Sequence, residues 1–386
     1  MEEERLIAYN IIHKTFSGRS LKEIFDSQTI PLNRLKTNTV KEITYGTVRH
    51  KLLIDHFFKE ATGQSITNAS SKTRDNLRMS IYQMHFMKKK DYAVVNEAVE
   101  LAESTDKRAK GFVNWALREF TRNRDKLSLP PGNNKKELSV KYSFPHHFID
   151  YLIKHNGFEG AADLTQFYNS HYNAVIYNIK THETREPGDD YELTSDEYII
   201  DPVYTDMFRM LEGNIHSVLD CCAAPGGKSV LVKSLYPEAS VTAVDRNPDR
   251  TALIDKNARR MNLNIETRVC DMLSLNLKKV FDLVIVDAPC TATGTIRKNP
   301  DVKYNYRKKI GPLRRLQTSL LEKADEFVKE NGMIFYITCS IFSEENQEIT
   351  EMFLQRHDNY KLQSEYFTFG NPHNGAYGAI LIKEEA

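Results

Sequence analysis

Hydrophobic residues follow two different spacings along this chain, and the change between them divides it into two parts. Up to about residue 127 they recur three and four positions apart, as in residues 6–12 and 93–102. This spacing is typical of amphipathic helices. Proline disrupts helices and occurs only once in this stretch, at Pro31. The pattern therefore predicts an all-α domain over residues 1–127.

Beyond about residue 206, short apolar runs alternate with helical stretches. We predict strands at residues 217–222, 241–245, 266–270, 282–287, 333–339 and 379–383, and helices near 228–235, 248–261, 312–330 and 343–356. Such alternation is typical of a doubly wound α/β sheet. We therefore expect an α/β domain over residues 206–386. The stretch 128–138, which contains Pro130, Pro131 and Gly132, reads as a linker.

Charge is distributed unevenly, although the whole chain carries only +1. Residues 1–150 hold 26 Lys and Arg against 18 Asp and Glu, a net charge of +8. Residues 151–200 hold 3 against 9, a net charge of −6. A basic N-terminal half suits contact with RNA phosphates, and a solvated helical surface explains it equally well.

The five cysteines do not indicate a disulfide framework, because their number is odd and two are adjacent. No Cys and His spacing typical of zinc is present. The first residues lack the basic and apolar regions of a signal peptide, and no apolar run approaches the roughly 20 residues that cross a bilayer. We expect a cytoplasmic protein that binds neither a metal nor a membrane.

Two of the cysteines come directly after predicted strands. Asp287-Ala288-Pro289-Cys290 closes one apolar run, and Thr338-Cys339 closes another. Ligands of parallel α/β sheets bind beyond the carboxyl ends of the strands, and a thiol in its thiolate form is a soft nucleophile. The pattern predicts covalent chemistry. The alternative is that both thiols are inert and buried, as cysteines commonly are.

A glycine-rich turn follows the strand predicted at 217–222. Glycines at 226 and 227 allow a close approach of the backbone to a ligand, and a helix N-terminus offers free N–H groups. The turn does not fit the dinucleotide signature G-x-G-x-x-G. Asp245 lies 19 positions after Gly226, where an acidic residue accepts hydrogen bonds from ribose hydroxyls. Asp245, and Asp271 after the next strand, could instead cap helices.

The ordered motifs C-A-A-P-G-G-K, D-A-P-C and T-C resemble those of the RsmB/Sun-type RNA 5-methylcytosine methyltransferases, which use S-adenosylmethionine. The resemblance covers nearly the whole chain. Residues 1–127 are similar to a NusB-like RNA-binding domain, residues 139–205 to a small α/β RNA-binding subdomain with a strand at 173–179, and residues 206–386 to a Rossmann-like class I methyltransferase domain.

The resemblance implies a role for each motif residue. Residues that would contact S-adenosylmethionine are Cys222, Ala223, Ala224, Pro225, Gly226, Gly227, Lys228, Asp245, Asp271 and Asp287. Cys339 matches the thiol that attacks the cytosine, and Cys290 matches the thiol implicated in product release. Asp287 matches the carboxylate that hydrogen-bonds the base. Cys221 reads as a packing residue, and the role of Arg250 stays open.

A basic strip follows the second motif. Its members are Arg297, Lys298, Lys303, Arg307, Lys308, Lys309, Arg314 and Arg315. We expect it to contact RNA phosphates, with a solvated face as the alternative. One departure from the family lies at Asp201, which stands without the Gln that usually precedes it.

The resemblance implies S-adenosylmethionine-dependent methylation of carbon 5 of a cytosine in RNA. The NusB-like N-terminus favours 16S ribosomal RNA as the substrate. A transfer-RNA methyltransferase with the same chemistry is one alternative, and a non-catalytic RNA-binding or antitermination factor is the other. We expect a monomer.

Overall fold

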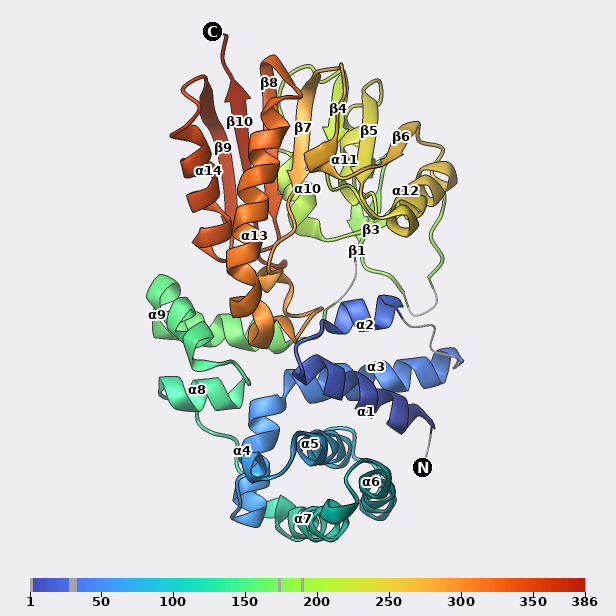
Figure 1. Cartoon of the computed structure of the whole chain (residues 1–386), viewed down its shortest axis with the longest axis vertical. Helices are drawn as coiled ribbons and strands as arrows, with labels where there is room; N and C mark the ends of the chain where they lie inside the picture. Colours follow the sequence, from blue (N-terminus) through green and yellow to red (C-terminus); the bar gives the residue numbers. More distant parts are fainter. Residues whose placement is uncertain (1–2, 28–32, 173–174, 189–190, 386) are drawn as a thin grey trace. The chain divides into compact units, whose positions relative to one another are not determined.

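The computed structural model describes residues 3–27, 33–172, 175–188 and 191–385 (Figure 1). The chain divides into two compact units. The first comprises Met1–Ser170 together with Ile296–Asn305, and the second comprises His171–Thr295 together with Tyr306–Ala386. Each unit is thus assembled from two separate stretches of the chain.

The first unit is helical. Its helices are α1 (Glu3–Phe16), α2 (Leu21–Ser27), α3 (Arg34–Arg49), α4 (Lys51–Thr62), α5 (Ser71–His85), α6 (Asp91–Thr105), α7 (Lys110–Asn123), α8 (Lys135–Lys141) and α9 (His146–Asn169). Asn33 and Ser70 cap α3 and α5, because their side chains accept hydrogen bonds from the third residue that follows. The predicted all-helical N-terminal domain is confirmed.

The segment Ile296–Asn305 belongs to this helical unit, and Lys303 anchors it. The Lys303 amine is fully buried, 2.9 Å from the Arg49 carbonyl oxygen and 3.4 Å from that of Tyr142, and lies over the Phe144 ring. Burial, and then the nearby Arg49 charge, lower the pKa of Lys303 well below its ordinary value. Lys303 is therefore not part of an exposed basic strip, and that expectation was wrong.

The second unit is built on a seven-stranded sheet in the order β6-β5-β4-β7-β8-β10-β9. The strands are β4 (Ser217–Asp220), β5 (Ser240–Asp245), β6 (Ile265–Val269), β7 (Phe281–Asp287), β8 (Val328–Thr338), β9 (Tyr360–Thr368) and β10 (Ala376–Lys383). The first five in this order are parallel, whereas β10 runs antiparallel to both β8 and β9.

Helices cover both faces of this sheet. Val218 and Leu283 pack with α10 (Pro202–Phe208), α11 (Gly227–Leu235) and α12 (Pro248–Arg260). Their chain neighbours Leu219 and Val284 pack on the opposite face with α13 (Val302–Asp325) and α14 (Gln347–Leu354). Successive strand residues point to opposite faces, so both faces are apolar. The predicted doubly wound Rossmann-like sheet is confirmed.

A separate three-stranded antiparallel sheet has the order β2-β1-β3. Its strands are β1 (Val175–Asn178), β2 (Thr184–Arg185) and β3 (Glu197–Ile200). They belong to the second unit, whereas α8 and α9 belong to the first. The first two residues of the strand predicted at 173–179 lie outside the described residues.

The division of the chain into a linker at 128–138, a small subdomain at 139–205 and a methyltransferase domain at 206–386 stays a prediction.

In the described ranges, we find no helix that combines the length and the apolar character needed to cross a membrane.

Candidate active site

The carboxyl ends of β4, β5, β7 and β8 bring the three predicted motifs together within the second unit. Lys228 Nζ lies 2.7 Å from Asp287 Oδ2, the Ala224 N–H donates to Asp245 Oδ2 at 3.2 Å, and Cys290 Sγ lies 3.3 Å from Cys339 Sγ. Short apolar strands followed by polar turns produce this arrangement, because parallel strands all end at one edge. The roles that the resemblance assigns to these residues stay predictions.

The glycine turn leaves a helix N-terminus uncapped. Gly226 has φ +103° and lies against Ile254, whose Cγ2 would be 3.2 Å from any added Cβ. Helix α11 begins at Gly227, and no side chain among the described residues caps it. Its first N–H groups are thus available to the polar groups of a small ligand. This turn fits the predicted contacts with S-adenosylmethionine.

Asp245 and Arg250 hold the glycine turn from one side. Asp245 is 4% exposed and accepts hydrogen bonds from the backbone N–H groups of Ala224 and Asn247. Arg250 donates to the Ala224 carbonyl oxygen at 2.6 Å and lies 3.6 Å from Asp245 Oδ2. Asn247, not Asp245, caps helix α12. Asp245 therefore does not cap this helix. Arg250 contacts both the glycine turn and Asp245.

Asp271 is exposed, and its side chain accepts a hydrogen bond from the Leu273 N–H at 3.0 Å. It thereby caps the 3-10 helix η4 (Met272–Ser274). A carboxylate oxygen has a second lone pair, so the cap leaves acceptor capacity for a ligand. The predicted contact of Asp271 with the adenine stays a prediction.

Lys228 forms a charge centre with Asp287. Its amine also lies 3.8 Å from the centroid of the Tyr204 ring, an aromatic contact that the sequence did not indicate. Burial by itself would lower the pKa of Lys228, but the Asp287 carboxylate outweighs it and raises the pKa above its ordinary value. Lys228 is therefore a fixed positive charge that orients Asp287.

Asp220 at the end of β4 is a buried carboxyl group that the sequence did not single out. Its Oδ2 accepts a hydrogen bond from Ser229 Oγ at 2.6 Å, while its fully buried Oδ1 finds no hydrogen-bond partner in the part of the chain that the structure describes. Burial raises the pKa of Asp220 to about 7. The group lies directly before the glycine turn and titrates near neutral pH.

The two thiols differ in their surroundings. The hydrogen bond to Cys339, and then burial, raise the pKa of Cys290 well above its ordinary value. Cys290 therefore keeps its proton at neutral pH, and its Sγ shares a hydrogen bond with Cys339 Sγ in which either sulfur can be the donor. All five cysteines are free, and Cys221 is 2% exposed within the core, as expected for a packing residue.

Two side chains that the sequence did not reveal hold the Cys290 turn. The buried Glu345 accepts hydrogen bonds from both the N–H and the hydroxyl group of Thr291, at 2.8 and 2.5 Å. Gln317 donates to the Pro289 carbonyl oxygen at 2.9 Å and to Glu345 at 3.1 Å. Glu345 lies beside another acidic residue in the first turn of a 3-10 helix, where acidic side chains are usually exposed. Nothing in the neighbouring sequence therefore predicts that it is buried.

The Cys339 turn is fixed in a similar way. Asn346 accepts a hydrogen bond from Thr338 Oγ1 at 2.5 Å and donates to the Ser340 carbonyl oxygen at 3.0 Å. The Gly294 N–H donates to the Cys339 carbonyl oxygen at 2.9 Å. The backbones on either side of both sulfur atoms are thus held by hydrogen bonds.

The residues of the predicted basic strip fall into two groups: some contact other side chains of the protein, and others are exposed. The Arg297 guanidinium lies over the Phe167 ring, and Arg314 forms an ion pair with Glu348 at 2.7 Å. Arg307, Lys308 and Arg315 on α13 are exposed. Contact with RNA phosphates stays a prediction for these exposed residues.

Nowhere in the described part of the chain do three or more His, Cys, Asp or Glu side chains form a group that could hold a metal ion.

Comparison with known proteins agrees with this geometry. The chain matches the family described as 16S rRNA methyltransferase RsmB/F over residues 209–379 and the NusB family over residues 2–122. Proteins named ribosomal RNA small subunit methyltransferase B from Serratia proteamaculans and Erwinia tasmaniensis are 26% and 24% identical. These matches cover 89% and 100% of this chain, and 88% and 99% of the relatives.

Two solved structures share the fold. The crystal structure of PH0851 has a TM-score of 0.74 at 21% identity and covers 100% of this chain and 99% of its own. A methyltransferase homolog from Pyrococcus horikoshii has a TM-score of 0.55 at 20% identity and covers 67% of this chain and 100% of its own. The resemblance drawn from the motifs is confirmed: residues 209–379 match the RsmB/F methyltransferase family, and residues 2–122 match the NusB family.

Proposed function

We propose that this protein transfers a methyl group from S-adenosylmethionine to carbon 5 of a cytosine in RNA, with small-subunit ribosomal RNA as the substrate. The observation that carries the proposal is the pair of thiols, 3.3 Å apart, in the same unit as the Lys228–Asp287 ion pair and the glycine turn. The family description and the names of the relatives support the ribosomal substrate. Such a substrate, and five free cysteines, suit a reducing cytoplasm.

The residues that would hold S-adenosylmethionine are the turn from Cys222 to Lys228, with Asp245 and Asp271 as acceptors for its ribose and adenine. When bound there, this molecule supplies an electrophilic methyl group. The uncapped N–H groups of α11 and the backbone of the turn would fix its orientation.

Carbon 5 of cytosine is a poor nucleophile, so the ring must first be activated. The Cys339 thiolate would add to carbon 6, which makes carbon 5 enamine-like and able to attack the methyl group. Asp287, paired with Lys228, would accept a hydrogen bond from the exocyclic amino group and orient the base. After transfer, water would take the proton from carbon 5, and the electron pair of that C–H bond would form the double bond between carbons 5 and 6. The bond from carbon 6 to Cys339 would then break, and the sulfur would leave as a thiolate.

Cys290 would act in this last stage. As a neutral thiol beside Cys339, it would position the departing sulfur and assist elimination. Glu345 and Gln317 would act through Cys290, because they fix its backbone and touch no reacting atom.

Bisulfite sequencing of total RNA from a deletion strain tests the proposal. We expect one unmethylated cytosine in small-subunit ribosomal RNA, restored by the wild-type gene. Loss of methylation in transfer RNA alone would replace the ribosomal substrate by the transfer-RNA alternative. Failure of the purified protein to bind S-adenosylmethionine in calorimetry would favour the non-catalytic RNA-binding factor.

A further inference from the structure

The two thiols of the candidate active site lie close enough to be joined. Cys290 Sγ and Cys339 Sγ are 3.3 Å apart, and both cysteines are free and only half-buried. The sulfur atoms of a disulfide lie about 2.05 Å apart, so an approach of about 1.2 Å would bring this pair to bonding distance. Small rotations of the two side chains can supply that approach, and a small oxidant can reach both sulfur atoms.

The backbone already holds the two sulfur atoms in this arrangement. They follow β7 and β8, which are neighbouring parallel strands of the sheet. The Ala288 N–H donates to the Ile337 carbonyl oxygen at 2.9 Å, and the Gly294 N–H donates to that of Cys339, also at 2.9 Å. A covalent bridge would therefore join two turns that are already linked, and it would not require the strands to separate.

No hydrogen bond joins any other two thiols in the described part of the chain. Cys270 is half-buried like the pair, but its sulfur contacts the Asp271 carbonyl oxygen and Ser274 Oγ, at 3.4 and 3.9 Å. Cys270 is thus a matched control for Cys290 and Cys339 within the same chain.

We propose that Cys290 and Cys339 form a redox modification site, at which hydrogen peroxide joins the two sulfur atoms in a disulfide and stops methyl transfer. The arrest rests on the proposed function, because the reaction needs the Cys339 thiolate, whereas formation of the disulfide does not. In a reducing compartment, a transient disulfide is typical of redox sensing.

One molecule of hydrogen peroxide balances the reaction. The Cys339 thiolate attacks one peroxide oxygen, the O–O bond breaks, and the departing hydroxide becomes water with the proton that Cys339 had released. Cys339 is then a sulfenic acid. The Cys290 sulfur attacks the Cys339 sulfur, the S–O bond breaks, and the Cys290 proton leaves with the hydroxyl group as a second water. A dithiol reductant restores both thiols by exchange.

The second thiol makes the arrest reversible. A sulfenic acid without a thiol nearby is oxidised further to a sulfinic acid, which thiol reductants do not reverse. Cys290, 3.3 Å away, reacts with the sulfenic acid of Cys339 before that step. Oxidation should therefore be reversible in the wild type and irreversible without Cys290.

The test compares the wild type, Cys290→Ser and the control Cys270→Ser. Each protein is treated with hydrogen peroxide, blocked with N-ethylmaleimide, digested without reductant and analysed by mass spectrometry. The wild type and the control should yield cross-linked Cys290 and Cys339 peptides that dithiothreitol separates. Cys290→Ser should yield a sulfinic acid at Cys339 that dithiothreitol leaves unchanged. No cross-link in the wild type, or equal recovery of disulfides that contain Cys270, would overturn the proposal.

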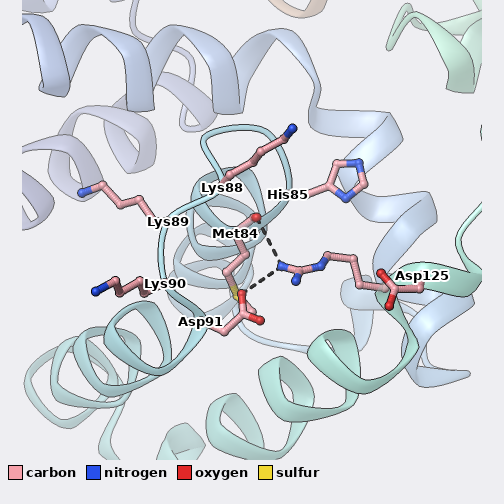
Figure 2. A pocket seen from close by; sticks show the side chains of 8 residues that line it. Met84, His85, Lys88, Lys89, Lys90, Asp91 and Asp125 are labelled. Atoms are coloured by element: carbon pink, nitrogen blue, oxygen red, sulfur yellow. Dashed lines mark hydrogen bonds and ion pairs between the residues drawn. The ribbon is translucent and has the colours of Figure 1, made fainter.

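Peroxide also oxidises methionine, so a buried methionine in each unit reports whether the chain stays folded. Met84 lines a cavity of about 480 Å³ in the helical unit and is only 1% exposed (Figure 2). Met207 is fully buried in the second unit. Neither should be oxidised while the disulfide forms. Oxidation of Met207 in step with the disulfide would mean that the thiols join only in an opened chain, and would overturn the proposal.

Methylation assays without reductant measure the arrest. The oxidised wild type should lose methyl transfer and regain it with dithiothreitol. Its affinity for S-adenosylmethionine in calorimetry should be unchanged, because the glycine turn and the Lys228–Asp287 ion pair contain neither sulfur atom. An oxidised protein that still methylates RNA would overturn the arrest.

The redox site and the proposed function fail in different ways. A reduced protein that methylates RNA but never forms the disulfide would remove the redox site alone. A disulfide that forms in a protein unable to methylate any RNA would remove the proposed function and leave the modification of the thiols in place.

Discussion

At the scale of single residues, the site depends on groups whose protonation is set by their neighbours. Cys290 is kept neutral by its bond to Cys339 and by burial, while Lys228 is kept charged by Asp287. The proposed reaction needs such a difference, because in it one thiol attacks and the other retains a proton.

The two thiols should fail in different ways when removed. Cys339→Ala deletes the proposed nucleophile, so methylation should fall to background and no RNA adduct should form. Cys290→Ala leaves attack and methyl transfer possible but impairs elimination. It should therefore accumulate RNA-linked protein that survives denaturing electrophoresis with radiolabelled RNA and S-adenosylmethionine. Trapping by Cys339→Ala instead would reverse the roles, and full activity of both variants would end the covalent hypothesis.

Asp220 should make stability depend on pH. Its pKa is about 7 in the folded protein and about 3.9 in an unfolded chain, so the folded state binds more protons between these values. Stability contributed by this group therefore falls as pH rises from about 4 to about 7. Asp220→Asn should remove that loss, and its advantage over wild type at pH 8 should be on the order of 2–4 kcal/mol.

Urea unfolding at pH 5 and pH 8 measures this difference. The exposed Asp249→Asn serves as the control, and it should give parallel curves. A constant difference between Asp220→Asn and wild type at both pH values would contradict the assignment.

Asp245→Ala should weaken binding of S-adenosylmethionine. The substitution removes the proposed ribose acceptor and also the hydrogen bond to the Ala224 N–H in the cofactor turn. A charge-assisted hydrogen bond is worth about 1–3 kcal/mol, which corresponds to roughly 5- to 150-fold in affinity. Isothermal calorimetry measures it, with Asp249→Ala on the neighbouring helix as the matched control. Equal affinities for the two variants would remove Asp245 from the cofactor site.

At the scale of helices and strands, regular patterns were predictable and irregular ones were not. Strands β4, β5, β6 and β7 lie within one or two residues of their predicted bounds. Strands β4, β5 and β7 are largely buried and apolar, as parallel strands inside a sheet are, whereas β6 is an edge strand with a single buried residue. The edge strand β9 was missed, since only one of its residues is buried and polar and apolar types are mixed along it. Helix α13 begins ten residues before the predicted start at Pro312, which lies inside it.

The turn at Gly294 offers a test at this scale. A Cβ on Gly294 would lie 1.8 Å from the Gly375 carbonyl oxygen, so the two backbones can meet only without a side chain. Gly294→Ala should push this turn, and with it the bond to the Cys339 carbonyl oxygen, out of place. We expect a loss of stability of about 1–3 kcal/mol and a fall in methyl transfer.

Gly311→Ala is the matched control, because nothing lies within 4 Å of a Cβ there and the residue is inside α13. Alanine favours a helix over glycine, so this variant should be as stable as wild type or slightly more so. Differential scanning calorimetry and a methylation assay compare the two. Equal behaviour would mean that the contact of Gly294 with Gly375 is not needed.

At the scale of the whole molecule, the sequence predicted that the candidate site residues lie close together. It did not predict which buried side chains hold them in place. Asp287, Cys290 and Cys339 were predictable because each ends an apolar run, and the ends of parallel strands meet. Glu345 was not predictable, because its partner Thr291 lies 54 positions away and only tertiary packing buries the carboxylate. The burial of Lys303 was missed for the same reason. A lysine is expected to be exposed, and the carbonyl oxygens that accept its hydrogen bonds lie far away in the sequence.

The helical unit is completed by ten residues, Ile296–Asn305, that lie far along the chain from its other part. Lys303 within them supplies donors to oxygen atoms of Arg49 and Tyr142 that would otherwise lose a buried partner. A single genetic crossover at the linker could therefore not exchange this domain for that of a relative. The recipient would also need a compatible segment between the two cysteine motifs, so these two stretches should be inherited together.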